Sequence, residues 1–161
     1  MSSFFDYPSG EVPGGGGRDD AGEVFLAEAS ERDWEVLLSY SRRRRYGPGD
    51  VVIAAGAPDR ALYLVVEGSL EVLAPLGGRG RDRFRPLGTV VEGSVIGEMS
   101  FFDGGGRSAV VRATSAVEIV EIGLAQFAAL AEADPGLGRQ ILFDLGRILA
   151  RRLRTAQASL R

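Results

Sequence analysis

The sequence predicts a mainly β domain: an eight-stranded antiparallel β-roll (jelly roll) with one helix before it and two helices after it. Two observations carry this prediction. From residue 42 to residue 122, short runs of Val, Ile, Leu and Tyr alternate with turn sequences such as GPG, GAPD and PLGG, which is the spacing of strands joined by tight turns. Before and after this segment the apolar residues recur at helical spacing, as expected for helices with one buried face.

The first helix is expected between Phe25 and Tyr40, with Ser30 as its N-cap candidate. Later strands of the roll are expected at residues 83–91, 94–97, 109–114 and 117–122. One helical turn, EMSFF, interrupts the roll after the strand that ends in VIGE. Of the two C-terminal helices, GLAQFAALAEADP stops before Pro135, and the second runs to the end of the chain with an apolar set of Ile141, Leu145, Ile148, Leu149, Leu153 and Leu160.

Length and composition indicate one globular domain preceded by a tail. With 161 residues, 45% of them hydrophobic, the chain can bury one sizeable core. Residues 1–22 are rich in Gly, Pro, Ser and Asp and lack apolar periodicity, which predicts a flexible tail. Its aromatic residues, Phe4, Phe5 and Tyr7, are either incidental or a short docking motif. Residues 23–161 are therefore expected to form the domain.

Missing residue types exclude several kinds of chemistry. The sequence has no Cys, His or Lys, and its 19 basic residues are all Arg. Zinc sites built from Cys and His, Cys or Ser-His-Asp nucleophiles and a Walker A lysine are therefore excluded. Only Glu98 and Asp103 offer a carboxylate pair for acid–base work, so we expect a protein that is not an enzyme.

Charge and hydropathy limit the partners further. The net charge is −3, so no overall basic field favours nucleic acid or a membrane. The N-terminus lacks the features of a signal peptide, and no apolar run reaches the roughly 18 residues of a membrane span; a cytoplasmic location is expected. Three arginine clusters are either faces for anionic partners or solvated surface: Arg42 to Arg45; Arg79, Arg81, Arg83 and Arg85, which share one strand face; and Arg151, Arg152 and Arg154.

The stretch GEMSFFDGGGRSAVV, residues 97–111, places an acid and an arginine in otherwise apolar sequence. A one-turn helix presents free backbone N–H groups at its start, which favours an anion there. The guanidinium of Arg107 is a planar fork suited to phosphate, Ser108 adds a hydroxyl, and Glu98 can accept a hydrogen bond from a sugar hydroxyl. The triple glycine lets the loop fold tightly over such a pocket. The alternative is an ion pair between Glu98 and Arg107 that joins two strands.

The string IGEMSFFDGGGRSAVVRAT, set within a helix, a roll and two further helices, resembles the phosphate-binding cassette of the cyclic nucleotide-binding domain family. The resemblance covers residues 25–157. It implies that Arg107 grips a cyclic phosphate and that Glu98 accepts from the ribose 2′-hydroxyl. The ligand-binding residues that it implies are Gly97, Glu98, Met99, Arg107, Ser108 and Ala109, with Val95, Ile96, Thr155 and Gln157 as pocket wall or base contacts.

The resemblance also implies a function, signal transduction by a regulatory domain. The ligand would be cAMP, with cGMP as the second choice, and the signal would pass through the C-terminal helix to an unidentified effector protein. Related domains pair through this helix, so a homodimer is expected. The chain ends at Arg161, so we expect neither a DNA-binding helix-turn-helix after the roll nor a membrane span. The alternative is a β-roll protein-interaction module that does not bind nucleotide.

Overall fold

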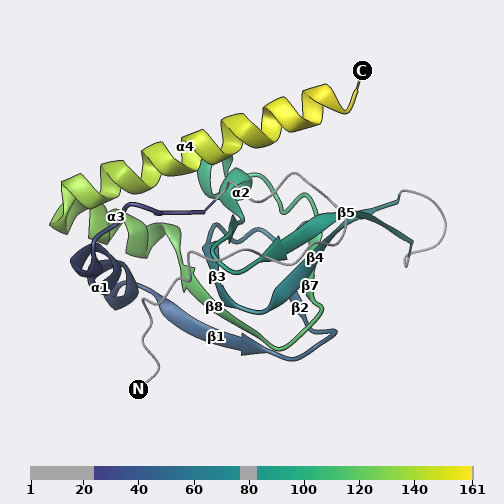
Figure 1. Ribbon diagram of the computed structural model, residues 1–161, viewed down its shortest axis with the longest axis horizontal. Helices are drawn as coiled ribbons and strands as arrows, with labels where there is room; N and C mark the ends of the chain where they lie inside the picture. The colour runs from purple at the N-terminus through teal and green to yellow at the C-terminus, as the bar shows by residue number, and fades with distance from the viewer. Residues whose placement is uncertain (1–23, 77–82, 161) are drawn as a thin grey trace.

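The computed structural model describes residues 24–76 and 83–160, and within them it confirms the predicted fold class (Figure 1). The roll is antiparallel and eight-stranded, with one helix before it, a short helix within it and two helices after it. In chain order the elements are α1 (Glu31–Ser39), β1 (Arg42–Tyr46), β2 (Val51–Ile53), β3 (Leu62–Glu67), β4 (Ser69–Pro75), β5 (Phe84–Val91), β6 (Val95–Ile96), α2 (Glu98–Asp103), β7 (Val110–Ala113), β8 (Val117–Ile122), α3 (Leu124–Ala133) and α4 (Pro135–Ala158).

The strands form two four-stranded sheets, one in the order β1-β8-β3-β6 and the other in the order β2-β7-β4-β5. One apolar cluster takes residues from both sheets, among them Val65 and Ile119 from the first and Leu70 and Val111 from the second. All four are at most 5% exposed. This cluster is the core of the roll, and it accounts for the alternating apolar pattern of the strands.

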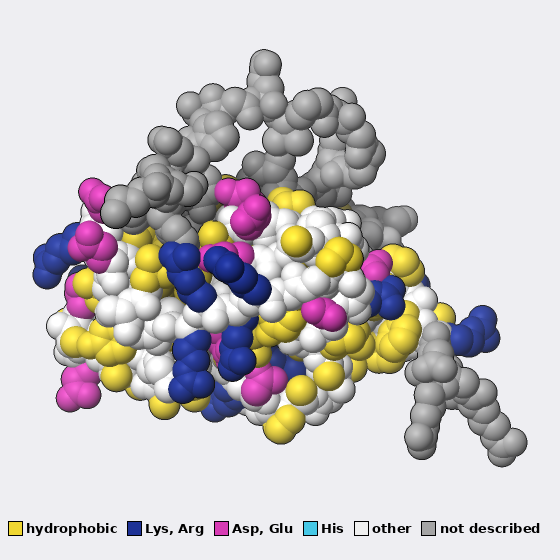
Figure 2. Space-filling model, turned by 90° about the horizontal axis from the view of Figure 1, so that it is seen from below, with side chains coloured by type: hydrophobic (Ala, Val, Ile, Leu, Met, Phe, Trp, Pro, Cys, Tyr) yellow, Lys and Arg dark blue, Asp and Glu magenta, His cyan; other side chains and the backbone are white. Residues whose placement is uncertain are grey.

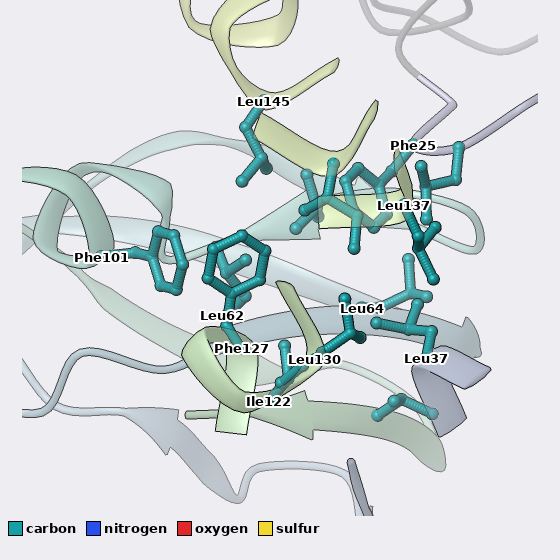
Figure 3. Packing of buried hydrophobic residues seen from close by; sticks show 14 of the residues in the cluster. Phe25, Leu37, Leu62, Leu64, Phe101, Ile122, Phe127, Leu130, Leu137 and Leu145 are labelled. Carbon is teal, nitrogen blue, oxygen red and sulfur yellow. The ribbon is translucent and has the colours of Figure 1, made fainter. Parts of the chain in front are cut away.

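The helices cover the other face of the first sheet. Leu62 and Leu64 alternate along β3 with Tyr63 and Val65, and they belong to the cluster that contains the buried residues of α1, α3 and α4 (Figure 3). Strand β3 is therefore buried on both faces, which explains why its sequence is a continuous apolar run. This packing fixes α4 relative to β6 and α2, the elements that carry the candidate site.

Local signals in the sequence set the ends of the helices. The Ser30 hydroxyl accepts from the Asp33 N–H, and the Asp33 carboxylate accepts from the Ser30 N–H, which is a capping box and confirms Ser30 as the N-cap. The segment from Phe25 to Ser30 is not helical. Leu26 has a φ of 54°, a left-handed conformation that a helix cannot contain. Helix α3 ends before Pro135 as predicted, and Asp134 caps α4 by accepting from the Leu137 N–H.

The structure describes the arginine cluster of β1 in full and only part of the second cluster. In β1, Arg43 and Arg45 pair with Glu118, and Arg44 pairs with Glu121 of the neighbouring strand β8. The underside of the molecule shows arginine beside acidic side chains (Figure 2). Two carboxylates thus pair with three arginines of this cluster and offset part of its charge. Of the second cluster, Arg79 and Arg81 lie outside the described residues. The predicted tail also lies outside them. None of the described helices is both long enough and apolar enough for a membrane span.

Candidate functional site

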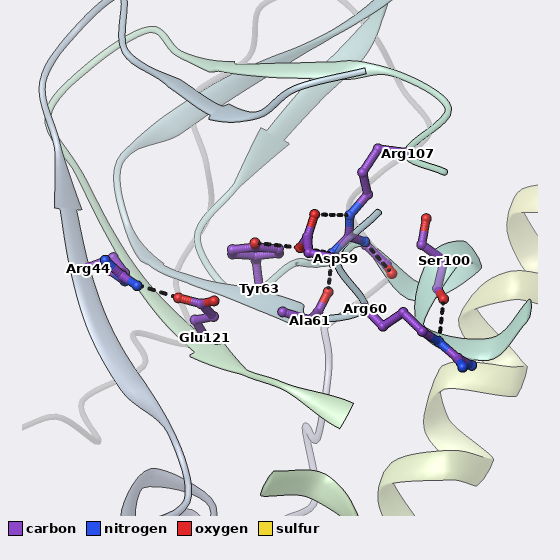
Figure 4. Close-up of polar contacts among 9 residues, drawn as sticks. Arg44, Asp59, Arg60, Ala61, Tyr63, Ser100, Arg107 and Glu121 are labelled. Atoms are coloured by element: carbon purple, nitrogen blue, oxygen red, sulfur yellow. Dashed lines mark hydrogen bonds and ion pairs between the residues drawn. The ribbon is translucent and has the colours of Figure 1, made fainter. Parts of the chain in front are cut away.

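Arg107 lies just before β7, and its side chain is only 3% exposed. Its Nε and Nη2 donate to the two carboxylate oxygens of Asp59 at 3.2 and 2.6 Å. Nη1 donates to the Gly97 carbonyl at 2.8 Å and Nη2 to the Ala61 carbonyl at 2.7 Å. The guanidinium carbon also lies 5.4 Å from the ring centre of Tyr63 (Figure 4). A buried charge is thus held by a carboxylate, two carbonyls and an aromatic face.

Asp59 joins this arginine to the surface. Its side chain is 42% exposed, and its Oδ2 accepts from the Tyr63 hydroxyl at 2.9 Å. The hydrogen bond from Arg107 lowers the pKa of Asp59, and the bond from Tyr63 works in the same direction. Burial, followed by the bond to Asp59, raises the pKa of Tyr63. Asp59 is therefore an ionised carboxylate at neutral pH and can be reached by solvent while it contacts a buried cation.

Gly97 brings the start of α2 against Arg107. Its φ is 89°, which favours glycine. A Cβ at this position would lie 2.6 Å from Nη1 of Arg107 and 2.8 Å from the Ala61 carbonyl. The Gly97 carbonyl can accept from Arg107 only because no side chain stands between them. The left-handed turn at Gly97 also ends β6 at Ile96, one residue before the predicted limit of that strand.

Glu98 is buried, at 6% exposed, and it does not pair with Arg107. Its Oε1 accepts from Nη1 of Arg152 at 2.6 Å, and Nη2 of Arg152 donates to the Val95 carbonyl at 3.0 Å. The alternative expectation of a Glu98–Arg107 ion pair was therefore wrong. The reason is topological: Arg107 meets the loop between β2 and β3, whereas Glu98 meets α4. The other predicted carboxylate, Asp103, accepts from the Gly105 N–H.

The remaining predicted site residues lie at different depths. Val95 and Ile96 are buried in β6, just before Gly97, at 1% and 5% exposed. Met99 is 54% exposed, and Ser108 is also exposed, with Ala109 half-buried beside it. Thr155 and Gln157 lie on the exposed last turns of α4, beyond Arg152. The structure thus brings together Val95, Gly97, Glu98 and Arg107, and it leaves Thr155 and Gln157 as exposed positions further along α4.

Three residues of this site were missed by the sequence analysis: Asp59, Arg60 and Arg152. Asp59 lies 48 residues from Arg107, and Arg152 lies 54 residues from Glu98. Arg60 donates to carbonyls of α2. Of the three, only Arg152 could have been found from the sequence. It follows the buried Ile148 by four residues and therefore lies on the same face of the helix. Within the described residues, every buried side-chain nitrogen and oxygen has a hydrogen-bond partner.

Comparison with known proteins supports the family that the sequence resembles. The family model described as cyclic nucleotide-binding domain matches residues 43–134. The chain is 34% identical over 124 residues to the cAMP-activated global transcriptional regulator Vfr of Pseudomonas aeruginosa, a match that covers 74% of this chain and 55% of the regulator. The chain spans about half the length of the curated transcriptional regulators that it matches.

Two solved structures resemble most of this chain. The crystal structure of the Thermus thermophilus catabolite activator protein has a TM-score of 0.70 and 32% identity, covering 81% of this chain and 58% of that one. The regulator CLP of Xanthomonas campestris, described as c-di-GMP responsive, has a TM-score of 0.69 and 30% identity, covering 81% of this chain and 63% of that one.

Proposed function

Because this chain belongs to the cyclic nucleotide-binding domain family, we propose that it is a cAMP sensor whose cassette, residues 95–109, holds the ligand and whose helix α4 passes the signal on. The observation that carries the proposal is the buried Arg107 beside the left-handed Gly97. The role is binding rather than catalysis. The domain is residues 23–161, and a cytoplasmic location stays a prediction.

The contacts of Arg107 suggest how a phosphate would reach it. A guanidinium has five N–H groups, and the hydrogen bonds to Asp59, Gly97 and Ala61 use one on Nε, one on Nη1 and both on Nη2. A cyclic phosphate would therefore take the place of Asp59, because it offers the same paired acceptor oxygens. Asp59 can leave toward solvent, since it is already 42% exposed. Ser108 and Ala109 would supply further donors beside the phosphate.

Glu98 would accept from the ribose 2′-hydroxyl, and this contact would reach α4. Arg152 of α4 already donates to Glu98 and to the Val95 carbonyl. A hydroxyl that donates to Glu98 shares the carboxylate with Arg152 and changes the geometry of that ion pair. The ligand would then bind with different affinities to two states of the domain that differ in the position of α4. Val95 and Ile96 would pack against the sugar. Met99 could contact the base only from the edge of the pocket, and Thr155 and Gln157 only after a movement of α4.

The outer face of α4 suits a partner helix, and we favour a second copy of this chain. Ile141, Leu145 and Ile148 are buried against the roll. A second stripe follows the spacing of a coiled-coil seam and contains Leu142, Gly146, Leu149, Leu153 and Ala156. Leu153 in this stripe is 60% exposed. Leu160, which the sequence placed in the same helix, lies beyond its last residue, Ala158. A separate effector protein is the other candidate for this face.

Titration calorimetry tests the proposal. The chain is titrated separately with cAMP, cGMP and cyclic di-GMP, the last because one structural neighbour is described as responsive to it. We expect binding of cAMP that is tighter than binding of cGMP. Absence of heat with all three, in a protein whose melting is cooperative, would instead support an interaction module that binds no nucleotide.

A further inference from the structure

The loop between β2 and β3, residues 54–61, contacts both sides of the glycine loop that separates α2 from Arg107. On the strand side, the Gly56 N–H donates to the Arg107 carbonyl at 2.7 Å and the Arg107 N–H to the Ala57 carbonyl at 3.0 Å. On the helix side, Arg60 reaches the end of α2 (Figure 4). The two consecutive residues Asp59 and Arg60 therefore hold opposite flanks of the cassette.

Arg60 forms a cap on the C-terminal end of α2. Its Nε donates to the Ser100 carbonyl at 3.1 Å, and its Nη2 donates to the carbonyls of Phe101 and Phe102 at 2.7 and 3.1 Å. These are carbonyls of the last turn, which have few partners within a helix, and a cation there also complements the helix dipole. Gly104 follows this end of the helix with a φ of 72°, a left-handed conformation that favours glycine.

Apart from Arg60, helix α2 is held by its buried side chains, Glu98, Ser100 and Phe101, and by the bond from the Gly104 N–H to the Ser100 carbonyl. It has six residues, too few to be stable alone. Among its outward side chains, Met99 and Phe102 are 54% and 41% exposed, while Phe101 is the buried anchor at 2%. The N-terminal end is held by Arg152 through Glu98, so the loss of Arg60 would free the C-terminal end.

We propose that Arg60 is a positioning residue for the cassette: it seats α2 before ligand arrives and thereby sets the affinity for the nucleotide without touching it. This inference rests on the proposed function. A protein in which α2 is seated only part of the time binds ligand more weakly by that fraction. Because the ligand binds only molecules in which α2 is seated, loss of Arg60 lowers the association rate, and the dissociation rate stays close to that of the wild type.

The test compares Arg60→Ala and Arg60→Lys with Arg112→Ala as a matched control. Arg112 is also a partly exposed arginine with fixed partners, but it pairs with Glu71 on the outside of the roll rather than with carbonyls of α2. Amide hydrogen exchange is measured across residues 98–104 without ligand, and cAMP affinity and rates by stopped flow and calorimetry. We expect Arg60→Ala to speed exchange in α2 and to raise the Kd about tenfold through slower association. Arg60→Lys should lie between, because an ammonium lacks the guanidinium fork.

Several outcomes would overturn the inference. Unchanged exchange in α2 would show that Arg60 does not hold the helix, and faster exchange with a Kd within twofold of wild type would show that seating does not set affinity. A loss that Arg112→Ala shares equally would mean general destabilisation. If Arg60→Ala does not fold, Arg60→Lys carries the same comparison. Failure of the wild-type chain to bind any of the three nucleotides would refute the proposed function, while the exchange measurement would still decide whether Arg60 seats α2.

Discussion

Replacement of Arg107 by alanine tests the centre of the site, and the structure allows its effect to be estimated. Charge-assisted hydrogen bonds contribute about 1.5–3 kcal/mol each. If the phosphate receives two of them, as Asp59 does now, their loss corresponds to a Kd raised by at least about 100-fold. Calorimetry with cAMP measures this directly, and cGMP should lose affinity in parallel because both ligands carry the same cyclic phosphate.

The same substitution also affects the fold. Arg107→Ala removes a donor from each of the carbonyls of Gly97 and Ala61. The Gly97 carbonyl still accepts from the Phe101 N–H, but a buried acceptor that loses its donor, such as the Ala61 carbonyl, costs about 1–3 kcal/mol. We therefore expect a lower melting temperature together with the loss of binding. Arg107→Lys separates the two effects, because it keeps the buried charge but cannot make the paired contact. A folded Arg107→Ala variant with wild-type affinity would refute the phosphate role of this arginine.

Three further predictions concern Glu98, Asp59 and the outer face of α4. Glu98→Gln should weaken cAMP binding less than Arg107→Ala but abolish the preference for cAMP over its 2′-deoxy analogue, since only a ribose hydroxyl benefits from the carboxylate; an equal loss for both ligands in calorimetry would contradict this. Asp59→Asn should lower the free energy of unfolding at pH 7. Because Arg107 lowers the folded pKa of Asp59 below its ordinary 3.8, the difference from wild type should shrink as the pH falls through that lowered pKa, and a difference that is constant down to pH 2 in denaturant titrations would refute the pairing. Leu153→Arg should give a monomer by light scattering with nucleotide binding retained, whereas a wild-type monomer with and without cAMP would exclude the dimer.

The strands, the helices and the position of the cassette could be predicted from the sequence because they depend on local signals. The alternation of apolar residues placed β8 at Val117–Ile122 as expected, and the capping box at Ser30 fixed the start of α1. The helical turn after VIGE was also found where expected. In each case the determining residues are neighbours in the sequence or lie one turn apart.

The partners of the buried charges could not be predicted in the same way. Asp59 stands in a turn-rich segment and Arg152 in a basic run of a helix, and both types of position are usually solvated. Their contacts depend on how the β2–β3 loop folds over the glycine loop and on how α4 packs against the first sheet. The expected pairing of Glu98 with Arg107 was wrong because it considered only charges that are close in sequence.

The proposed exchange of Asp59 for a phosphate would explain how an arginine can stay buried and still respond to a ligand. Removing a partner from a buried ion pair is strongly unfavourable, because it leaves an uncompensated charge. Arg107 avoids that state if one acceptor pair replaces another, since its contacts with Gly97 and Ala61 can persist throughout. The released carboxylate goes to a position that already reaches water. Hydration of the released carboxylate offsets the loss of its bonds to Arg107, so the phosphate contacts still favour binding. Contacts of the ribose with Glu98, and through it with Arg152, then decide which state of α4 the ligand favours.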